Sequence, residues 1–448
     1  MTAMPLPDSA ASTGAGARTV SCADRDAFDE ALTAAKAHYA ERRPASGAEW
    51  RSAARVMPGG NTRTILYFDP FPVCMTGGSG CNLVDADGIR YVDLLGEYTA
   101  GIYGHSNPVI QAAVIEALRN GLSLSAHNPA EVRLASLICA RYPSIERVRF
   151  TNSGTEANLL ALATAAAFTG RERVLVFEGA YHGSLLKFGE PRSPINVPHR
   201  FIIAPYNDID AARAAIREHS GHLAGVLVEP MLGAGGCIPG DPAFLGALAE
   251  EARAAGALLI FDEIQTARLS TGGRQALLGI TPDLTTLGKY HGGGLSFGAF
   301  GGSAQLMSLY DPRKPGALSH AGTFNNNVLS MAAGHAGLSK VLTAETLDGL
   351  NGRGDSLRAR LNELLTGIDA RFKLTGLGSL MNFHSTGEPV RASTALSLLF
   401  FDLLERGYYI APRGFIALSL PVDDPTLDSF VDAVREVMLS RAALFCGR

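Results

Sequence analysis

The succession of short apolar segments and longer amphipathic ones predicts an α/β protein with a mostly parallel sheet covered by helices. Five apolar segments are expected as strands: Arg147–Phe150, Arg173–Phe177, Gly225–Val228, Leu258–Phe261 and Leu284–Leu287. Helical segments such as Pro242–Ala255 lie between them, as crossover helices between parallel strands do. The length of 448 residues and the hydrophobic content of 46% allow a large core and predict a second, smaller α/β domain as well.

The N-terminal part is expected to form an arm and one part of the smaller domain. Residues 1–25 are rich in Ala, Ser, Thr and Gly and lack the apolar core of a signal peptide, which predicts a disordered tail. Residues 28–56 have a helical, amphipathic pattern, which Pro58 and the two glycines after it end. Residues 81–95 predict a small hairpin of two strands around an Asp-Gly turn.

The C-terminal part changes in pattern and predicts the rest of the smaller domain. Helices are expected near Leu357–Leu365, Ser393–Glu405 and Leu427–Leu444, with a strand at Leu380–His384. We therefore expect four parts: a disordered tail (1–25), an N-terminal arm with part of the small domain (26–95), a large domain (96–338) and the C-terminal small domain (339–448).

The composition favours a small-molecule substrate. The net charge is −4 and the Lys and Arg residues are scattered, which makes nucleic acid a poor candidate partner. The six cysteines are widely spaced without a CxxC pattern or a Cys/His cluster, which argues against a zinc site or a disulfide framework and fits a reducing cytosol. No apolar run reaches the roughly 20 residues that span a bilayer. We expect a cytoplasmic protein that binds no membrane.

A phosphate-binding turn is predicted where the first of these strands meets the helix that follows it. Ser153, Gly154 and Thr155 stand at the start of that helix, where backbone N–H groups are free and the helix dipole is positive. The same residue types are common in an ordinary helix N-cap. The turn therefore identifies a phosphate site only together with other motifs.

An acid and a lysine near strand ends predict pyridoxal phosphate chemistry. Asp262 ends the strand Leu258–Phe261, and ligands of open α/β sheets bind beyond the carboxyl ends of the strands, where a carboxylate keeps a pyridine nitrogen protonated. Lys289 follows an apolar strand and precedes Gly292–Gly294, a stretch that lets the backbone approach a ligand and the amine leave and re-enter a covalent link. Taken alone, a capping acid and a surface lysine are the alternatives.

Six segments of the sequence occur together in a specific order. They are Asn152–Asn158, Tyr181–Gly183, Glu229-Pro230, Asp262–Thr266, Gly288-Lys289 with Gly292–Gly294, and Gly322–Phe324. In these segments the chain resembles the class III aminotransferases from about Met57 to its C-terminus, above all the glutamate-1-semialdehyde aminomutase branch and, within it, bacterial β-phenylalanine (β-amino acid) aminotransferases. The resemblance implies a fold-type I transferase with a seven-stranded sheet, pyridoxal 5′-phosphate (PLP) as the cofactor, and a homodimer.

The resemblance also implies roles for single residues. Lys289 is expected to be the Schiff-base lysine and Asp262 the partner of the pyridine nitrogen. The other cofactor-binding residues that it implies are Ser153, Gly154 and Thr155 at the phosphate, Tyr181 and His182 at the ring, Gln265 and Glu229 along the same wall, and Thr323, which would reach the phosphate in the neighbouring subunit. Each active site of the homodimer would then need both chains.

Two arginines predict where substrate carboxylates bind. Arg63 lies in the N-terminal arm and Arg413 lies between a proline and a glycine, and each can form a bidentate pair with a carboxylate. By position they match the two arginines of β-phenylalanine aminotransferases. The match implies Arg63 for the carboxylate of the β-amino acid and Arg413 for that of the keto-acid acceptor. An ion pair between domains is the alternative for both.

The expected reaction is the transfer of an amino group from a β-amino acid to 2-oxoglutarate or pyruvate by a ping-pong mechanism. The segment Gly322–Asn327 and the surroundings of Arg63 and Arg413 favour this reaction over a glutamate-1-semialdehyde aminomutase. That aminomutase and another ω-amine transaminase remain alternatives, as do a racemase, decarboxylase or lyase on the same cofactor. A scaffold without turnover is disfavoured because Lys289 and Asp262 are both present.

Overall fold

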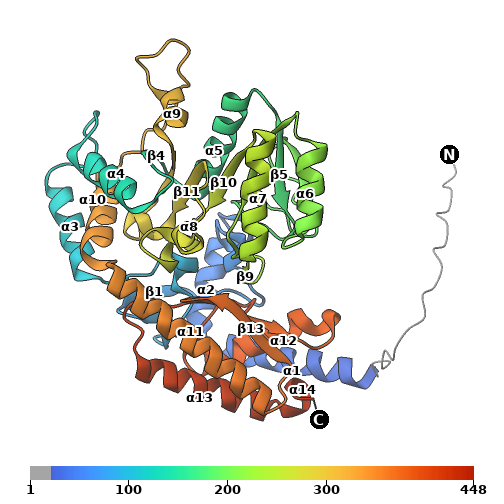
Figure 1. Ribbon diagram of the computed structural model, residues 1–448. Helices are drawn as coiled ribbons and strands as arrows, with labels where there is room; N and C mark the ends of the chain where they lie inside the picture. The colour runs from blue at the N-terminus through green and yellow to red at the C-terminus, as the bar shows by residue number, and fades with distance from the viewer. Residues whose placement is uncertain (1–21, 448) are drawn as a thin grey trace, which may run out of the picture.

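The computed structural model describes residues 22–447, with side chains from residue 27 onward. The fold is α/β, as the sequence predicts, and Figure 1 shows a large sheet between helices in the upper part and the smaller sheets with the C-terminal helices below. No helix in residues 22–447 combines the length and the apolar character that crossing a membrane requires.

The elements have the following bounds. The helices are α1 (Cys22–Arg42), α2 (Pro44–Ala53), α3 (Pro108–Arg119), α4 (Pro129–Arg141), α5 (Gly154–Thr169), α6 (Ile209–Glu218), α7 (Pro242–Ala255), α8 (Gly273–Leu278), α9 (Ala304–Met307), α10 (Val328–Ala336), α11 (Ala344–Gly367), α12 (Pro389–Glu405), α13 (Asp424–Ser440) and α14 (Ala442–Phe445). The strands are β1 (Met75–Ser79), β2 (Asn82–Asp85), β3 (Arg90–Asp93), β4 (Arg147–Thr151), β5 (Arg173–Phe177), β6 (Arg200–Ala204), β7 (Leu223–Val228), β8 (Met231–Leu232), β9 (Ile238–Pro239), β10 (Leu258–Asp262), β11 (Leu284–Gly288), β12 (Gly298–Gly302), β13 (Phe372–Leu377), β14 (Leu380–Ser385), β15 (Tyr408–Tyr409) and β16 (Phe415–Ala417).

The large sheet has seven strands in the order β4-β12-β11-β10-β7-β5-β6. Strand β12 runs antiparallel to both of its neighbours, whereas the other pairs are parallel. The carboxyl ends of β4, β5, β7, β10 and β11 therefore meet at one edge of the sheet. This edge is where the sequence predicts the site.

The five predicted strands of this sheet are confirmed, but the sequence reading missed β6 and β12. Strand β12 has the sequence Gly-Ala-Phe-Gly-Gly, which lacks the β-branched residues that usually indicate a strand. Its glycines have a steric reason: a Cβ at Gly298 would lie 2.1 Å from the carbonyl oxygen of Ser153. A side chain at Gly298 would thus displace the turn that leads into α5.

Apolar side chains of successive residues cover the two faces of the sheet. In β5, Val174 and Val176 pack in a cluster with residues of α5, whereas Leu175 and Phe177 pack in a cluster with residues of α6 and α7. This two-sided burial explains why the strand is continuously apolar rather than alternating. Helix α5 is thereby held against one face, and its N-terminus lies at the edge where β4 and β10 end.

The smaller sheets join the two ends of the chain. In the sheet β1-β2-β3-β15, the hairpin β2–β3 predicted from the Asp-Gly turn is confirmed, and β15 from the C-terminal part pairs with β3. The remaining three-stranded sheet is β13-β14-β16. Figure 1 shows α1, in blue, beside the orange and red C-terminal helices, and α1 packs on α12. The N-terminal segment therefore belongs to the same body as the C-terminal part.

The helical pattern of residues 28–56 forms two helices rather than one. Helix α1 ends at Arg42 and α2 begins at Pro44, because a proline ring disfavours the helical conformation of the residue before it. Of the tail expected at residues 1–25, residues 1–21 lie outside the described part of the chain. Residues 22–25 form the first turn of α1, to which Ala and Arg are well suited.

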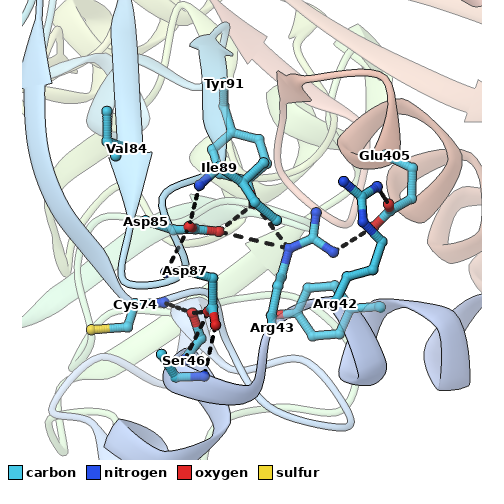
Figure 2. A network of polar contacts seen from close by, with 12 residues as sticks. Arg42, Arg43, Ser46, Cys74, Val84, Asp85, Asp87, Ile89, Tyr91 and Glu405 are labelled. Carbon is cyan, nitrogen blue, oxygen red and sulfur yellow. Dashed lines mark hydrogen bonds and ion pairs between the residues drawn. The ribbon is translucent and has the colours of Figure 1, made fainter.

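Arg43, at the break between the two helices, is the centre of a buried polar network (Figure 2). Its guanidinium donates to the Tyr91 hydroxyl at 2.9 Å and pairs with Glu405 of α12, while Tyr91 donates to Asp85 at 2.5 Å. Next to it, Asp87 of the hairpin accepts from the backbone and hydroxyl of Ser46. The network joins α2, the hairpin β2–β3 and α12, and so fixes the N-terminal arm relative to the small sheets.

Candidate active site

A cavity of about 280 Å³ lies at the carboxyl edge of the large sheet, beside the N-terminus of α5. Nine predicted cofactor residues line it: Ser153, Gly154, Thr155, Tyr181, His182, Glu229, Asp262, Gln265 and Lys289. Thr323, Arg63 and Arg413 do not line it. The sequence reading did not single out the remaining lining residues, which are Asn152, Gly183, Ile264 and Leu295–Phe297.

The anion-binding end of the cavity is the start of α5. Ser153 caps the helix, and its hydroxyl accepts from the backbone N–H of Glu156 at 3.2 Å. The N–H groups of Gly154 and Thr155 precede the first intrahelical donor and so stay available to a ligand. Gly154 lets the backbone lie close to Ile264, because a Cβ would lie 2.3 Å from Cδ1 of Ile264 and would displace that side chain. The geometry suits a phosphate group.

The acid end is Asp262, at the last position of β10. One carboxylate oxygen accepts from Asn158 at 2.8 Å and bonds to Nδ1 of His182 at 2.7 Å, and the other accepts from the backbone N–H of Ile264 at 3.1 Å. Nε2 of His182 is buried without a hydrogen-bond partner. Because Asp262 is almost fully buried and held from three sides, its charge has a fixed position facing the cavity.

Asn158 ends the segment Asn152–Asn158, but the sequence alone assigned it no role. Its side-chain amide donates to Asp262 and to the backbone carbonyl of His182, while its oxygen accepts from Thr286 at 2.7 Å. The signal was its position one turn into α5, four residues after Gly154. A search for a buried donor that could orient Asp262 would have found it.

Lys289 enters the cavity from the end of β11. Its φ is +55°, a left-handed conformation that is rare for residues other than glycine. Burial lowers the pKa of the Lys289 amine, and the negative charge of Asp262 acts in the opposite direction. A lowered amine pKa increases the neutral fraction that can act as a nucleophile or a base.

Tyr181, Glu229 and Gln265 form a further wall of the cavity. The Glu229 carboxylate accepts from the backbone N–H of Tyr181 at 2.9 Å and from that of Gly233 at 3.1 Å. Burial raises the pKa of Glu229 to about 7, with a smaller opposing effect of His182. The side-chain oxygen of Gln265 is buried without a partner, whereas the Tyr181 ring is 39% exposed. This wall thus offers an aromatic face and an unused amide to a ligand.

The two arginines lie beyond the cavity and share one aromatic ring. The guanidinium groups of Arg63 and Arg413 are each 5.8 Å from the centre of the Tyr98 ring. Arg413 donates to the carbonyl of Ala234 at 2.6 Å and keeps its buried Nε unpaired, whereas Arg63 pairs with Glu97. Their charges act on the Tyr181 hydroxyl, whose pKa burial raises. They therefore lie at the side of the cavity that Tyr181 forms.

Thr323 is exposed and does not reach the cavity of its own chain. The segment that carries it nevertheless lies near the phosphate end, because Asn152 donates to Asn325 at 3.0 Å. The exposed position leaves Thr323 available to a second subunit, as the resemblance implies.

Comparisons with known proteins identify the class. The model of the aminotransferase class-III family matches residues 67–438. A β-phenylalanine transaminase from Variovorax paradoxus is 52% identical over 426 residues, which are 93% of this chain and 98% of that protein. A glutamate-1-semialdehyde 2,1-aminomutase from Methanothermobacter thermautotrophicus is 36% identical over 412 residues, 87% of this chain and 97% of that protein. A crystal structure of a β-phenylalanine aminotransferase from Variovorax paradoxus has a TM-score of 0.91 at 52% identity, and covers 94% of this chain and 99% of that one.

The protein is thus a fold-type I, PLP-dependent enzyme. More narrowly, the chain belongs to the class III aminotransferases, a PLP-dependent family of transaminases.

The residues of the cavity fit PLP. The N-terminus of α5 suits its phosphate, Asp262 suits a protonated pyridine nitrogen, and Lys289 is an amine that lines the same cavity. The buried, unpaired side-chain oxygen of Gln265 adds a polar group to the lining. These residue types suit the three chemically distinct parts of the cofactor.

Proposed function

We propose that this aminotransferase moves the amino group of a β-amino acid similar to β-phenylalanine to 2-oxoglutarate or pyruvate by a ping-pong mechanism. The observation that carries the proposal is the pair of arginines over the Tyr98 ring beside the cavity. A reaction that uses two acids in turn, with the carboxylate at different distances from the reacting carbon, is well served by two cations at different positions. The 52% identity to a β-phenylalanine transaminase supports the same substrate class.

The nine predicted cofactor residues each have a task in this proposal. Ser153, Gly154 and Thr155 would hold the phosphate of PLP, and Asp262 would keep the pyridine nitrogen protonated. Tyr181 would lie at the ring, and His182, Glu229 and Gln265 would form the wall beside it. When bound, PLP supplies the electron sink that makes the C–H bond at the amine-bearing carbon acidic.

Lys289 moves the proton. With PLP bound, its amine would take the proton from the amine-bearing carbon of the donor and would later give a proton to the C4′ carbon of the cofactor. Its left-handed backbone directs the side chain from the end of β11 into the cavity, and burial favours the neutral amine that proton abstraction requires. With the acceptor keto acid the same amine carries the proton in the reverse direction.

Arg63 and Arg413 select the substrates. In a β-amino acid the amine lies one carbon further from the carboxylate than in an α-amino acid, so the carboxylate needs a cation at a different distance. We assign the donor carboxylate to Arg63 on the N-terminal arm and the acceptor carboxylate to Arg413, which the Ala234 carbonyl holds.

The test is a half-reaction. Cofactor-loaded protein is mixed with β-phenylalanine alone, and the conversion of the bound cofactor from its aldehyde form to its amine form is followed by absorbance. We expect conversion, and reversal on addition of 2-oxoglutarate or pyruvate. Absence of conversion with β-phenylalanine, together with conversion by glutamate-1-semialdehyde or by a terminal amine, would assign the protein to the aminomutase or ω-amine branch.

We also propose that the enzyme is a cytoplasmic homodimer in which Thr323 of one subunit reaches the phosphate in the other. Light scattering of the holoenzyme tests the dimer. Mixed dimers of Lys289→Ala and Thr323→Ala chains test the shared site, because one of their two sites contains both original residues and the other lacks both. If Thr323 acts on its own chain instead, no site in the mixed dimer has both.

A further inference from the structure

The chain contains an uncommon stretch of backbone between β3 and α3. Gly96, Glu97, Tyr98 and Thr99 have φ values of +53°, +48°, +51° and +84°. Four consecutive left-handed residues, three of them not glycine, are unfavourable for L-amino acids and persist only where surrounding contacts hold them.

Contacts from both sides hold this left-handed turn. Asp93 accepts from the backbone N–H groups of Leu95 and Gly96, each at 2.9 Å, and its other oxygen bonds to His105 at 2.9 Å. A Cβ at Gly96 would lie 2.6 Å from the carbonyl oxygen of Ala417, so the turn is pressed against β16. The conformation is therefore built into the packing.

The turn directs two neighbouring side chains to the carboxylate-binding side of the site. The Tyr98 ring is buried, stacks on Phe415 at 6.0 Å and lies under both arginines. The Glu97 carboxylate, 54% exposed, pairs with Arg63. The two arginines thus differ: Arg413 is bonded to the neutral carbonyl of Ala234, whereas Arg63 already has a carboxylate.

We propose that Glu97 is a built-in competitor for the donor carboxylate: it occupies Arg63 in the free enzyme, and the carboxylate of the donor must displace it. The proposal rests on the function proposed above, in which Arg63 binds the donor. It makes Glu97 a specificity-determining residue, because an amine without a carboxylate cannot displace Glu97 and leaves the pair in place.

The exposure of the pair makes the exchange feasible. The Arg63 side chain is 44% exposed and that of Glu97 is 54% exposed, so water screens their attraction. Exposed pairs of this kind change a binding constant by a factor of about two to five. Such a contact is strong enough to bias Arg63 and weak enough for a substrate to replace.

The experiment measures binding of 3-phenylpropionate, which has the carboxylate of the donor but no amine and therefore cannot react. Calorimetry on cofactor-loaded protein gives its Kd for the original enzyme and for Glu97→Gln. We expect binding to be about two- to fivefold tighter in the variant. In the background of Arg63→Ala, the same substitution should have no effect.

Glu172→Gln is the matched control, because Glu172 also forms an exposed pair, with Arg200, and does not line the cavity. The Kd of 3-phenylpropionate for Glu172→Gln should equal that for the original enzyme. Glu97→Asn is a second variant for the case that glutamine does not fold at this position, because asparagine tolerates a left-handed backbone better than most residues. It removes the same charge and should tighten binding similarly.

Unchanged or weaker binding of 3-phenylpropionate by the folded Glu97 variants would overturn the proposal. An equal effect of Glu97→Gln with and without Arg63 would also overturn it, as would the absence of binding to both the original enzyme and Glu97→Gln. A larger Kd in the Glu97 variants would mean that Glu97 positions Arg63 rather than competes for it. Failure of the proposed function is recognised separately, because then the original enzyme does not undergo the half-reaction with β-phenylalanine, whatever Glu97 does.

Discussion

Arg413→Lys tests the acceptor site, because it keeps the charge and removes the planar fork of donors. In the structure one guanidinium nitrogen is already bonded to the Ala234 carbonyl, and the buried Nε is unpaired, which leaves an edge free for a carboxylate. Hydrogen bonds to charged groups contribute about 1.5–3 kcal/mol, and lysine replaces a bidentate contact by a single one. We expect kcat/KM for 2-oxoglutarate to fall by roughly 10- to 100-fold.

The assay separates the two half-reactions. In a ping-pong mechanism, kcat/KM of the donor is measured on the aldehyde form of the cofactor and that of the acceptor on the amine form. Arg413→Lys should change the value for β-phenylalanine by no more than about threefold, since the proposed donor site is Arg63.

Arg391→Lys is the matched control. Its side chain is also largely buried and lies over an aromatic ring, that of Phe28 at 5.7 Å, but it does not line the cavity. It should change neither half-reaction. Equal losses in both half-reactions of Arg413→Lys, or no loss with 2-oxoglutarate, would refute the assignment of Arg413.

Three further predictions concern the cavity itself. Lys289→Ala should abolish turnover while the circular dichroism spectrum and melting temperature show a folded protein, and appreciable activity would exclude it as the proton carrier. Gly233→Ala should weaken PLP binding to the apoenzyme, because the new Cβ would lie 2.3 Å from the amide of Gln265 and push it aside. Gly246→Ala is the control, because a Cβ at Gly246 has no atom within 4 Å. Equal PLP affinities of the two variants would argue against a role of Gln265. Burial raises the pKa of Glu229 to about 7 from 4.5. Between these pH values the native apoenzyme therefore keeps a proton that the unfolded chain has lost. The resulting contribution to stability is complete below about pH 4.5 and is lost as the pH rises through about 7. Glu229→Gln should remove this dependence, so that its melting temperature gains on that of the original apoenzyme between about pH 5 and pH 8, and parallel melting profiles would contradict the assigned burial.

The parts of the fold that the sequence predicted are those in which local pattern and tertiary packing agree. Strand β5 is apolar at nearly every position because helices cover both of its faces, and helix α7 runs from Pro242 to Ala255 as its pattern predicts. Strand β12 could not be predicted, because its glycines are explained by close contacts with distant segments. Gly298, for example, lies against the turn at Ser153, which is 145 residues away in sequence. The break at Arg43 was readable from Pro44 and was overlooked.

The candidate site divides in the same way. Asp262 and Lys289 could be singled out because each stands at the end of an apolar strand, where chemistry is expected. Asn158 had only the weak signal of its position one turn into α5, and Tyr98 had none, because their importance lies in what they contact. Asn158 orients Asp262, and Tyr98 supports two arginines from different ends of the chain. No local spacing records that Arg63 and Arg413 share one ring.

The different settings of the two arginines fit the proposal that one active site binds two acids in turn. If both arginines were equally free, each acid could bind at either of them, and unproductive complexes would compete with the reaction. Arg413 is held by the Ala234 carbonyl and by two aromatic rings, so its free edge has a fixed direction. Arg63 is exposed and covered by Glu97, so that only a ligand with further contacts in the site gains enough to displace the glutamate. Under the proposed roles, the acceptor would be selected by a rigid site and the donor by a competition. Removing Glu97 should then make the enzyme bind simple carboxylic acids more tightly, at the cost of inhibition by them.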